Sequence, residues 1–431
     1  MRKFLLLLIC LALLAACGAN GAEVYEPEIY EPEACAPEET TPPPPARNIL
    51  LPAEGNASDF SADAAYLVEL IEAVHPIFIL EGRLPDYYDA LRAEFLAYTA
   101  QPISRNAFVL AIRRYFTTLH DLHASIWPQT ASTFITEPFI FRDGRLFLLY
   151  EPDVEILAIG GVDIADIFYQ IDRHVFHENE AHRAVTYRLQ ARNIIYLHMA
   201  GAEIYYYTAR IRPPAANFIV RHRMIDDVFF IDLRTCTDGP HMYPVVEAIE
   251  QAIADGIYKF IIDVRGNPGG SSMPGIRMLE AMGITSPRFG VTRRVSEQLV
   301  ANWRAQGFEP DFDTSVERID FLPDYEIAEN PNNVFISVLT DNFTASAAME
   351  IGVRVQDGNF GNIIGEPSAN APSCFGATSP YTLPNSGLNV SISSSWIARP
   401  NPNADQNTLY PDIWTEAADA LDVALEYLAR R

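Results

Sequence analysis

Short apolar runs that alternate with helical stretches constrain the fold of this chain more than any other feature of its sequence. Each run has the length of a buried strand, and the runs are Val228–Leu233, Phe260–Val264 and Val334–Leu339. Helical stretches follow them at Tyr243–Ala254, after Pro274 and from about Ala345, and a further helix is expected at Ala417–Arg431. Strands that alternate with helices are typical of an α/β core, which we predict for residues 216–431.

An amphipathic helical pattern precedes this core. From Ala64 to Val74 the apolar residues recur at helical spacing, and a second helical stretch covers Tyr87–Tyr98. A third helix is expected after Ser104, a favourable N-cap residue, and its apolar face would continue to His123. We therefore predict a small N-terminal helical bundle over residues 56–130.

The pattern between the bundle and the core changes to short strands. Apolar segments near Phe139–Phe141, Leu146–Tyr150 and Ile156–Ile159 are separated by the turn pairs Asp143-Gly144 and Gly160-Gly161. Residues 131–215 are therefore expected to form a β-rich insert.

The N-terminus has the pattern of an export signal. Arg2 and Lys3 precede an apolar run from Phe4 to Ala16, which is shorter than the roughly 20 residues needed to span a bilayer. Leu14-Ala15-Ala16-Cys17 resembles the lipobox of bacterial lipoproteins, which implies a signal peptide over residues 1–16 and lipid on Cys17. An ordinary signal peptide with a chance cysteine is the alternative. The expected location is the extracytoplasmic face of a bacterial cell membrane.

Residues 17–55 have the composition of an extended spacer. The stretch repeats Tyr-Glu-Pro-Glu and runs into four consecutive prolines, so it carries too little apolar surface to fold by itself. We predict an acidic, Pro-rich linker that holds the folded part away from the membrane.

Charge and cysteine content exclude several classes of function. The chain has 56 Asp and Glu against 31 Lys and Arg, a formal net charge of −25, which excludes nucleic acid as an electrostatic partner. Of five cysteines, only Cys236 and Cys374 lie in the part expected to fold beyond the linker, so there is no disulfide framework. Whether these two cysteines pair is left open by the sequence.

A glycine-rich turn is the first segment with features of a catalytic or anion-binding site. Val264-Arg-Gly-Asn-Pro-Gly-Gly-Ser-Ser follows a predicted buried strand and precedes a helix, where free backbone N–H groups can bind a negative charge. The segment lacks the glycine patterns of dinucleotide-binding and Walker A loops. It fits an oxyanion hole better.

Ser346 and His123 are the candidate nucleophile and base. Ser346 lies near the start of a helix, where the helix dipole favours a developing oxyanion, although a serine there is also a common N-cap. His123 lies in Leu119-His-Asp-Leu-His-Ala-Ser, and histidine is the usual general base at neutral pH. The alternatives are a core histidine or a solvent-facing pair with His120.

Together these segments resemble peptidase family S41, which includes C-terminal processing and tricorn-like peptidases. The resemblance rests on Phe260-Ile-Ile-Asp-Val-Arg-Gly-Asn-Pro-Gly-Gly, Thr344-Ala-Ser-Ala-Ala-Met-Glu-Ile, Ile364-Gly-Glu-Pro-Ser, Leu383-Pro-Asn-Ser-Gly-Leu and Tyr410-Pro-Asp-Ile, and on His75-Pro76 and Asp121-Leu-His123. It implies an α/β core of ββα units, similar to the crotonase and Clp peptidase subunits. It also implies that Glu155-Ile-Leu-Ala-Ile-Gly-Gly-Val-Asp-Ile belongs to a degenerate PDZ-like insert.

The resemblance also assigns roles to residues. Members of the family use either a lysine after the serine or a histidine far upstream as base, and this chain has only Lys3 and Lys259, neither of which follows Ser346. The base is therefore expected to be His123. The family position of the acid is occupied by Asp405, and the oxyanion hole carries over to the backbone of Ala347 and of Gly269 or Gly270.

The function expected from these assignments is a membrane-anchored serine peptidase without a cofactor, acting on a peptide or protein substrate. No metal site is predicted, because His174, His177 and His182 lack the zincin spacing and are interpreted as part of a solvated helix. The alternative is a catalytically inactive S41-fold lipoprotein that binds a ligand or peptide. Ser368-Ala369-Asn370, where look-alikes have Thr-Gly-Gly, favours that alternative.

Overall fold

The computed structural model describes residues 57–127, 139–142, 144–148, 151–155, 157–159, 162–187 and 219–431. The predicted signal peptide, Cys17, the predicted linker and parts of the predicted insert lie outside these residues. Within the described part, no helix combines the length and the apolar character needed to cross a membrane.

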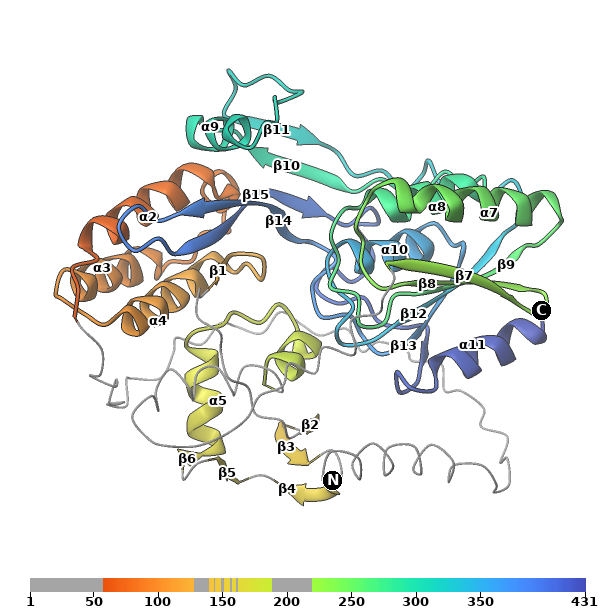
Figure 1. The fold of residues 1–431 in the computed structure, drawn as a ribbon, viewed down its shortest axis with the longest axis horizontal. Helices are drawn as coiled ribbons and strands as arrows, with labels where there is room; N and C mark the ends of the chain where they lie inside the picture. Colours follow the sequence, from red (N-terminus) through yellow and green to blue (C-terminus); the bar gives the residue numbers. More distant parts are fainter. Residues whose placement is uncertain are drawn as a thin grey trace, which may run out of the picture.

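A six-stranded sheet forms the centre of the second half of the chain (Figure 1). Its strand order is β16-β13-β12-β9-β8-β7. The first five strands in this order run parallel to one another, and β7 is antiparallel at one edge. The strands are β7 (Val220–Ile225), β8 (Val228–Leu233), β9 (Lys259–Asp263), β12 (Phe335–Thr340), β13 (Gly361–Gly365) and β16 (Ile413–Trp414). All three predicted apolar runs are strands of this sheet, and the mixed α/β class is confirmed.

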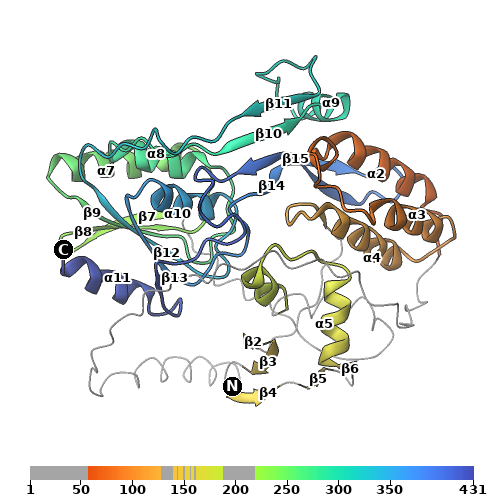
Figure 2. The same ribbon diagram turned by 180° about the vertical axis from the view of Figure 1, so that it is seen from behind.

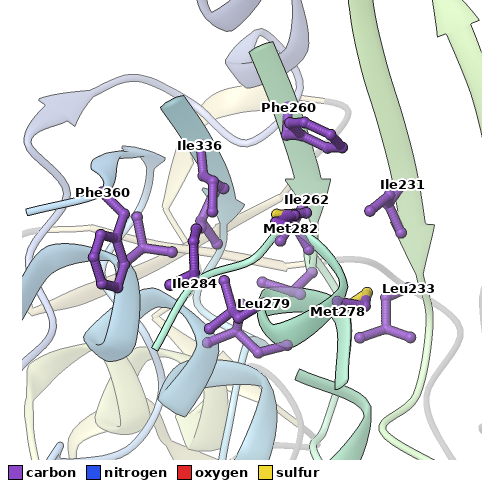
Figure 3. Close-up of a cluster of buried hydrophobic side chains, with 14 of the residues drawn as sticks. Ile231, Leu233, Phe260, Ile262, Met278, Leu279, Met282, Ile284, Ile336 and Phe360 are labelled. Carbon is purple, nitrogen blue, oxygen red and sulfur yellow. The ribbon is translucent and has the colours of Figure 1, made fainter. Parts of the chain in front are cut away.

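Helices cover both faces of this sheet, because its central strands have apolar side chains on both sides. The helices α7 (Tyr243–Ala254), α8 (Met273–Ala281) and α10 (Ala347–Asp357) pack on one face, and α11 (Ala420–Ala429) packs on the other. Phe260 and Ile262 of β9 lie in the core of the first face, whereas Ile261 lies in that of the second. Figure 3 shows the first of these cores, where Met278 and Leu279 meet the strands.

Three helices near the N-terminus form a second packing unit. They are α2 (Ser61–Val74), α3 (Tyr88–Thr99) and α4 (Arg105–Phe116), and a 3₁₀ turn, η1 (Pro76–Ile79), follows the first. The predicted Ser104 cap is present, since its Oγ accepts from the N–H of Ala107 at 3.2 Å. The core of this unit also contains Phe375, Val390 and Ile392, so it is shared with strands from the other end of the chain.

The position of His123 differs from the expected one. The helix α4 ends at Phe116 and is followed by a 3₁₀ turn, η2 (Thr117–Leu119), and by His120 in a left-handed conformation at φ 48°. This break ends the helical repeat, so His123 lies on a turn before β1 (Ser125–Trp127) and not on the helix face.

A second sheet joins the helical unit to the core (Figure 2). It contains β1, β10 (Gly290–Arg294), β11 (Arg318–Phe321), β14 (Cys374–Thr382) and β15 (Asn389–Ala398), and α9 (Glu297–Ala305) connects β10 to β11. Ser125 of β1 pairs with Ser391 of β15, and β15 pairs with β14. This pairing places the turn that carries His123, which directly precedes β1, beside β15.

The described part of the insert contains short strands followed by helix. The elements are β2 (Phe139–Arg142), β3 (Arg145–Leu148), β4 (Glu151–Glu155), β5 (Ala158–Ile159), β6 (Val162–Asp163) and α5 (Ile164–Asp172), and residues 180–187 are also helical. The expected strands are present, whereas the PDZ-like character stays a prediction. His174 and His182 are buried, so the interpretation of their segment as a solvated helix is wrong.

The two cysteines whose pairing the sequence left open are both free thiols. Cys236 and Cys374 are buried thiols, and burial raises the pKa of each well above its usual value. They behave as small apolar core residues in this fold.

Candidate active site

Ser346 has a backbone conformation that residues with a side chain rarely adopt. It lies between β12 and α10 with φ 53° and ψ −130°, a strained region for any residue other than glycine. Its side chain makes no capping hydrogen bond to α10, so Ser346 does not act as the common N-cap serine. The strain therefore requires other contacts to hold it, and among the described residues the hydroxyl has no hydrogen-bond partner.

Neighbouring segments fix this conformation. The N–H of Ser346 donates to Oδ1 of the buried Asn370 at 2.6 Å, and the N–H of Ala345 donates to the carbonyl of Asn267 at 3.0 Å. The Oγ1 of Thr344 donates to the carbonyl of Val264 at 3.0 Å. The serine turn is thus bound to the glycine turn on one side and to the loop before β14 on the other.

The glycine turn lies against the serine. A Cβ on Gly269 would meet Cβ of Ser346 at 2.6 Å and the carbonyl oxygen of Ala345 at 2.7 Å, and Gly269 has φ +98°. A Cβ on Gly270 would meet the carbonyl oxygen of Cys236 at 2.6 Å, at φ +136°. Both positions therefore require glycine for space and for backbone conformation.

The backbone donors near Ser346 differ in their availability. The N–H of Gly269 donates to Oδ1 of Asn267 at 2.9 Å, so this group is already engaged. Within the described residues, the N–H groups of Gly270 and Ala347 make no hydrogen bond. These two groups fit the oxyanion donors that the sequence suggested, and they favour Gly270 over Gly269.

His123 is held by the neighbouring Asp121. The backbone N–H of His123 donates to Oδ1 of Asp121 at 2.8 Å, while the ring Nδ1 lies 3.8 Å from the same oxygen, too far for a hydrogen bond. The Nδ1 atom is buried and has no hydrogen-bond partner, although the side chain as a whole is 20% exposed. The described residues show no hydrogen bond between His123 and Ser346 Oγ.

Asp121 is itself fixed by a second histidine. Its Oδ2 lies 3.1 Å from Nε2 of the buried His75, whose Nδ1 accepts from the N–H of Ile77 at 3.2 Å. This arrangement assigns the proton of His75 to Nε2, so that His75 donates to Asp121. Burial alone would raise the pKa of Asp121, but the hydrogen bond from His75 and the electrostatic interactions with His75 and His123 outweigh it, and the pKa is lowered.

Glu178 is a residue of the site that the sequence interpretation missed. Its Oε1 accepts from the N–H of Leu122 at 3.2 Å, and its Oε2 accepts from the N–H of Ala371 at 2.8 Å. One ligand atom each from Asp121, His123 and Glu178 lie within 4.8 Å of one another, a donor set of the types that bind divalent cations. Glu178 has no spacing signal, because it is remote in sequence from both Ser346 and His123.

Asp405 makes its contacts within its own loop. It is exposed, and its Oδ1 accepts from the N–H groups of Asn407 and Thr408 at 2.7 and 2.8 Å. The described residues include no contact between Asp405 and His123. The structure therefore brings Ser346, Ala347, Gly269 and Gly270 together, and groups His123 with Asp121 and Glu178.

Arg265 supports the glycine turn. Its Nε donates to Oδ1 of Asp263 at 2.8 Å, its NH2 donates to Oδ2 at 2.7 Å, and its NH1 donates to the carbonyl of Ala417. This bidentate pair ties the turn to the end of β9.

An open cavity lies beside this group of residues. It has a volume of about 770 Å³, and Glu178, Ala371 and Cys374 are among the residues that line it. Aromatic residues line much of the remainder, including Tyr87, Phe375 and Trp396. A space of this size is large enough to accept peptide side chains.

Comparisons with known proteins agree with the resemblance seen in the motifs. Residues 231–414 match the sequence model described as peptidase family S41. A crystal structure of a mutant of CPAF has a TM-score of 0.56 at 15% identity, covering 86% of this chain and 96% of that chain. Mature CPAF has a TM-score of 0.54 at 15% identity, covering 86% of this chain and 95% of that chain.

The structure of the photosystem II D1 C-terminal processing protease has a TM-score of 0.45 at 12% identity, covering 84% of this chain and 94% of that chain. No curated protein matches the sequence. The likeness to CPAF shows a shared fold, and the family match confirms the S41 resemblance for residues 231–414.

Proposed function

We propose that this protein is a serine peptidase anchored by lipid on Cys17 at the extracytoplasmic face of a bacterial membrane, because residues 231–414 match the peptidase S41 family and the N-terminus resembles a lipoprotein signal. Its substrate is a peptide or protein, and the open cavity beside the site offers space for side chains of that substrate.

The proposed reaction is acyl transfer through a covalent intermediate. Ser346 Oγ attacks the carbonyl carbon of the scissile bond, and His123 takes the hydroxyl proton and returns it to the leaving amine. The N–H groups of Gly270 and Ala347 bind the oxyanion of the tetrahedral intermediate. Water then attacks the acyl-enzyme, with His123 again acting as base. None of these steps requires a cofactor.

The strained backbone of Ser346 is the observation that carries this proposal. A serine at φ 53° is costly and persists only where its surroundings hold it, and such strain clusters at active sites. Here the strained residue also has a free hydroxyl, and two free N–H groups lie in the same turns. An ordinary N-cap serine would show none of these features.

The alternative is an inactive S41-fold lipoprotein that binds a ligand or peptide. It is favoured by the lack of a hydrogen bond between Ser346 and His123 in the described residues. Catalytic hydrogen bonds are often long in free enzymes and tighten when substrate binds, so the strained serine weighs more.

Labelling with a fluorophosphonate distinguishes the two functions. The full-length protein, the Ser346→Ala and His123→Ala variants and a His120→Ala control are treated with the reagent, and their intact masses are measured. His120 is a matched control, because it lies on the same turn and contacts Tyr87 OH at 2.7 Å.

We expect one adduct on the wild-type protein and on the control, and none on the other two variants. A folded wild-type protein that forms no adduct would favour the ligand-binding alternative.

A further inference from the structure

The carboxylate of Glu178 connects the turn of the candidate base with the loop that holds the candidate nucleophile. One oxygen accepts from the N–H of Leu122, next to His123, and the other accepts from the N–H of Ala371. Ala371 follows Asn370, whose side chain accepts from the N–H of Ser346. A single side chain therefore sets the distance between the two segments.

The neighbouring residue holds Glu178 in place. Nδ2 of Asn179 donates to the carbonyls of Ser368 and Asn407 at 3.3 and 3.1 Å. Its Oδ1 accepts from the N–H of His182 at 2.8 Å and so caps the helix at 180–187. Because Asn179 is fixed on three sides, the backbone at Glu178 has little freedom to move.

Nδ1 of His123 has no hydrogen-bond acceptor in the part of the chain that the structure describes. A histidine that acts as base needs such an acceptor, which fixes its tautomer and stabilises the imidazolium that forms. Asp121 already receives the backbone N–H of His123 on one oxygen and His75 on the other. The carboxylate of Glu178 is the other acid within 4.8 Å of both residues.

We propose that Glu178 is the positioning residue of this site, orienting His123 and stabilising its imidazolium form. This inference rests on the proposed function, in which His123 takes the proton of Ser346. Asp405, the residue at the family position, is the competing assignment, and the same experiment tests it.

If Glu178 has this role, its charge should affect how the rate of labelling depends on pH. The pKa of Glu178 is raised to about 8, because burial and the charge of Asp121 raise it by more than the N–H groups of Ala371 and Leu122 lower it. The other titratable groups near it are His123, on the same turn as Asp121, and His120 and Cys374, which line the same cavity. The carboxylate forms as the pH rises through about 8, so the stabilisation of the imidazolium increases there.

The test measures the second-order rate constant for the reaction of full-length protein with a fluorophosphonate between about pH 6 and about pH 9.5. The variants are Glu178→Gln, the conservative Glu178→Asp and the control Asp405→Asn. We expect the wild-type rate to rise near pH 8 and Glu178→Gln to lack that rise, so that it reacts like the wild type near about pH 6 and about 100-fold more slowly near about pH 9.5. Asp405→Asn should react like the wild type, and Glu178→Asp should keep a rise in rate at a reduced level.

Each outcome separates the inference from the proposed function. Wild-type rates and an unchanged pH profile in Glu178→Gln overturn the inference, and a slow Asp405→Asn variant returns the role to Asp405. If Glu178→Gln does not fold, wild-type rates and an unshifted profile in Glu178→Asp overturn it instead. A wild-type protein that does not react, or reaction that persists in Ser346→Ala, contradicts the proposed function itself.

Discussion

Gly269 lies directly against Ser346, so that a Cβ at position 269 would come within 2.6 Å of Cβ of the serine. The glycine turn after β9 and the serine turn before α10 are therefore packed into each other without space for a methyl group. The same contact places the free N–H groups of Gly270 and Ala347 in the two turns that meet at Ser346.

Gly269→Ala should remove fluorophosphonate labelling and destabilise the fold. The added methyl meets backbone atoms that cannot move aside, and overpacking of this kind costs about 1–3 kcal/mol beyond the strain of positive φ. Gly266→Ala is the matched control, because Gly266 has φ +72° but open space around its Cβ. The control should lose about 1 kcal/mol and keep labelling. Urea unfolding and intact mass measure both effects, and equal losses in the two variants would contradict the packing argument.

Replacing the strained serine by glycine should stabilise the protein relative to replacing it by alanine. Alanine at φ 53° keeps the strain, which costs about 1–3 kcal/mol, whereas glycine adopts this conformation freely. Glycine also loses about 0.5–1 kcal/mol through the flexibility of the unfolded chain. We expect Ser346→Gly to exceed Ser346→Ala by about 1 kcal/mol in the free energy of unfolding. A less stable glycine variant would show that Ser346 is not strained in solution.

Asn370→Leu should slow labelling of Ser346 by more than its effect on stability explains. The change removes the acceptor of the Ser346 N–H, and an unsatisfied buried donor costs about 1–3 kcal/mol. Asn362→Leu is the control, because Asn362 is also buried but bonds Ser337 in the central sheet. Both variants should unfold at lower urea, but only Asn370→Leu should label slowly. Slow labelling in both would indicate a general effect of destabilisation.

The contribution of Glu178 to the stability of the protein should fall as the pH rises from about 4.5 to about 8. In this window the folded state holds a proton on Glu178 that the unfolded state has lost, because burial raises the folded pKa to about 8. Stability decreases with pH wherever the folded state binds more protons. The unfolding free energy of Glu178→Gln, relative to wild type, should therefore increase with pH. Parallel curves for the two proteins would contradict the raised pKa.

Cys17→Ser should release the protein from the membrane. Lipid on Cys17 would supply the anchor, and the described part of the chain contains no membrane-spanning helix. Detergent phase partitioning of cells that express each form measures the effect, and a change of Cys35→Ser serves as the control. A Cys17→Ser protein that stays in the detergent phase would rule out this anchor.

The local patterns of the chain were sufficient to predict much of the core. Residues 228–233 and 334–339 are apolar at all but one position each, Asp232 and Ser337, because the strands are covered on both faces, and the sequence shows such runs directly. Helical spacing of apolar residues predicted α2, α3 and α7, because each of these helices buries part of its surface against the core. The end of α4 was missed, since the apolar spacing continues past Phe116 while the backbone turns at His120.

The sequence by itself determined the α/β core, the glycine turn and the serine that follows a strand, because each is encoded within a few neighbouring residues. Only the tertiary structure placed Glu178 beside His123 and Ala371, since those contacts join segments that are remote along the chain. It also showed that Ser346 is strained and that the N–H of Gly269 is engaged. Backbone conformation and hydrogen-bond partners depend on which segments come into contact in space, and a local residue pattern does not show which remote segments those are.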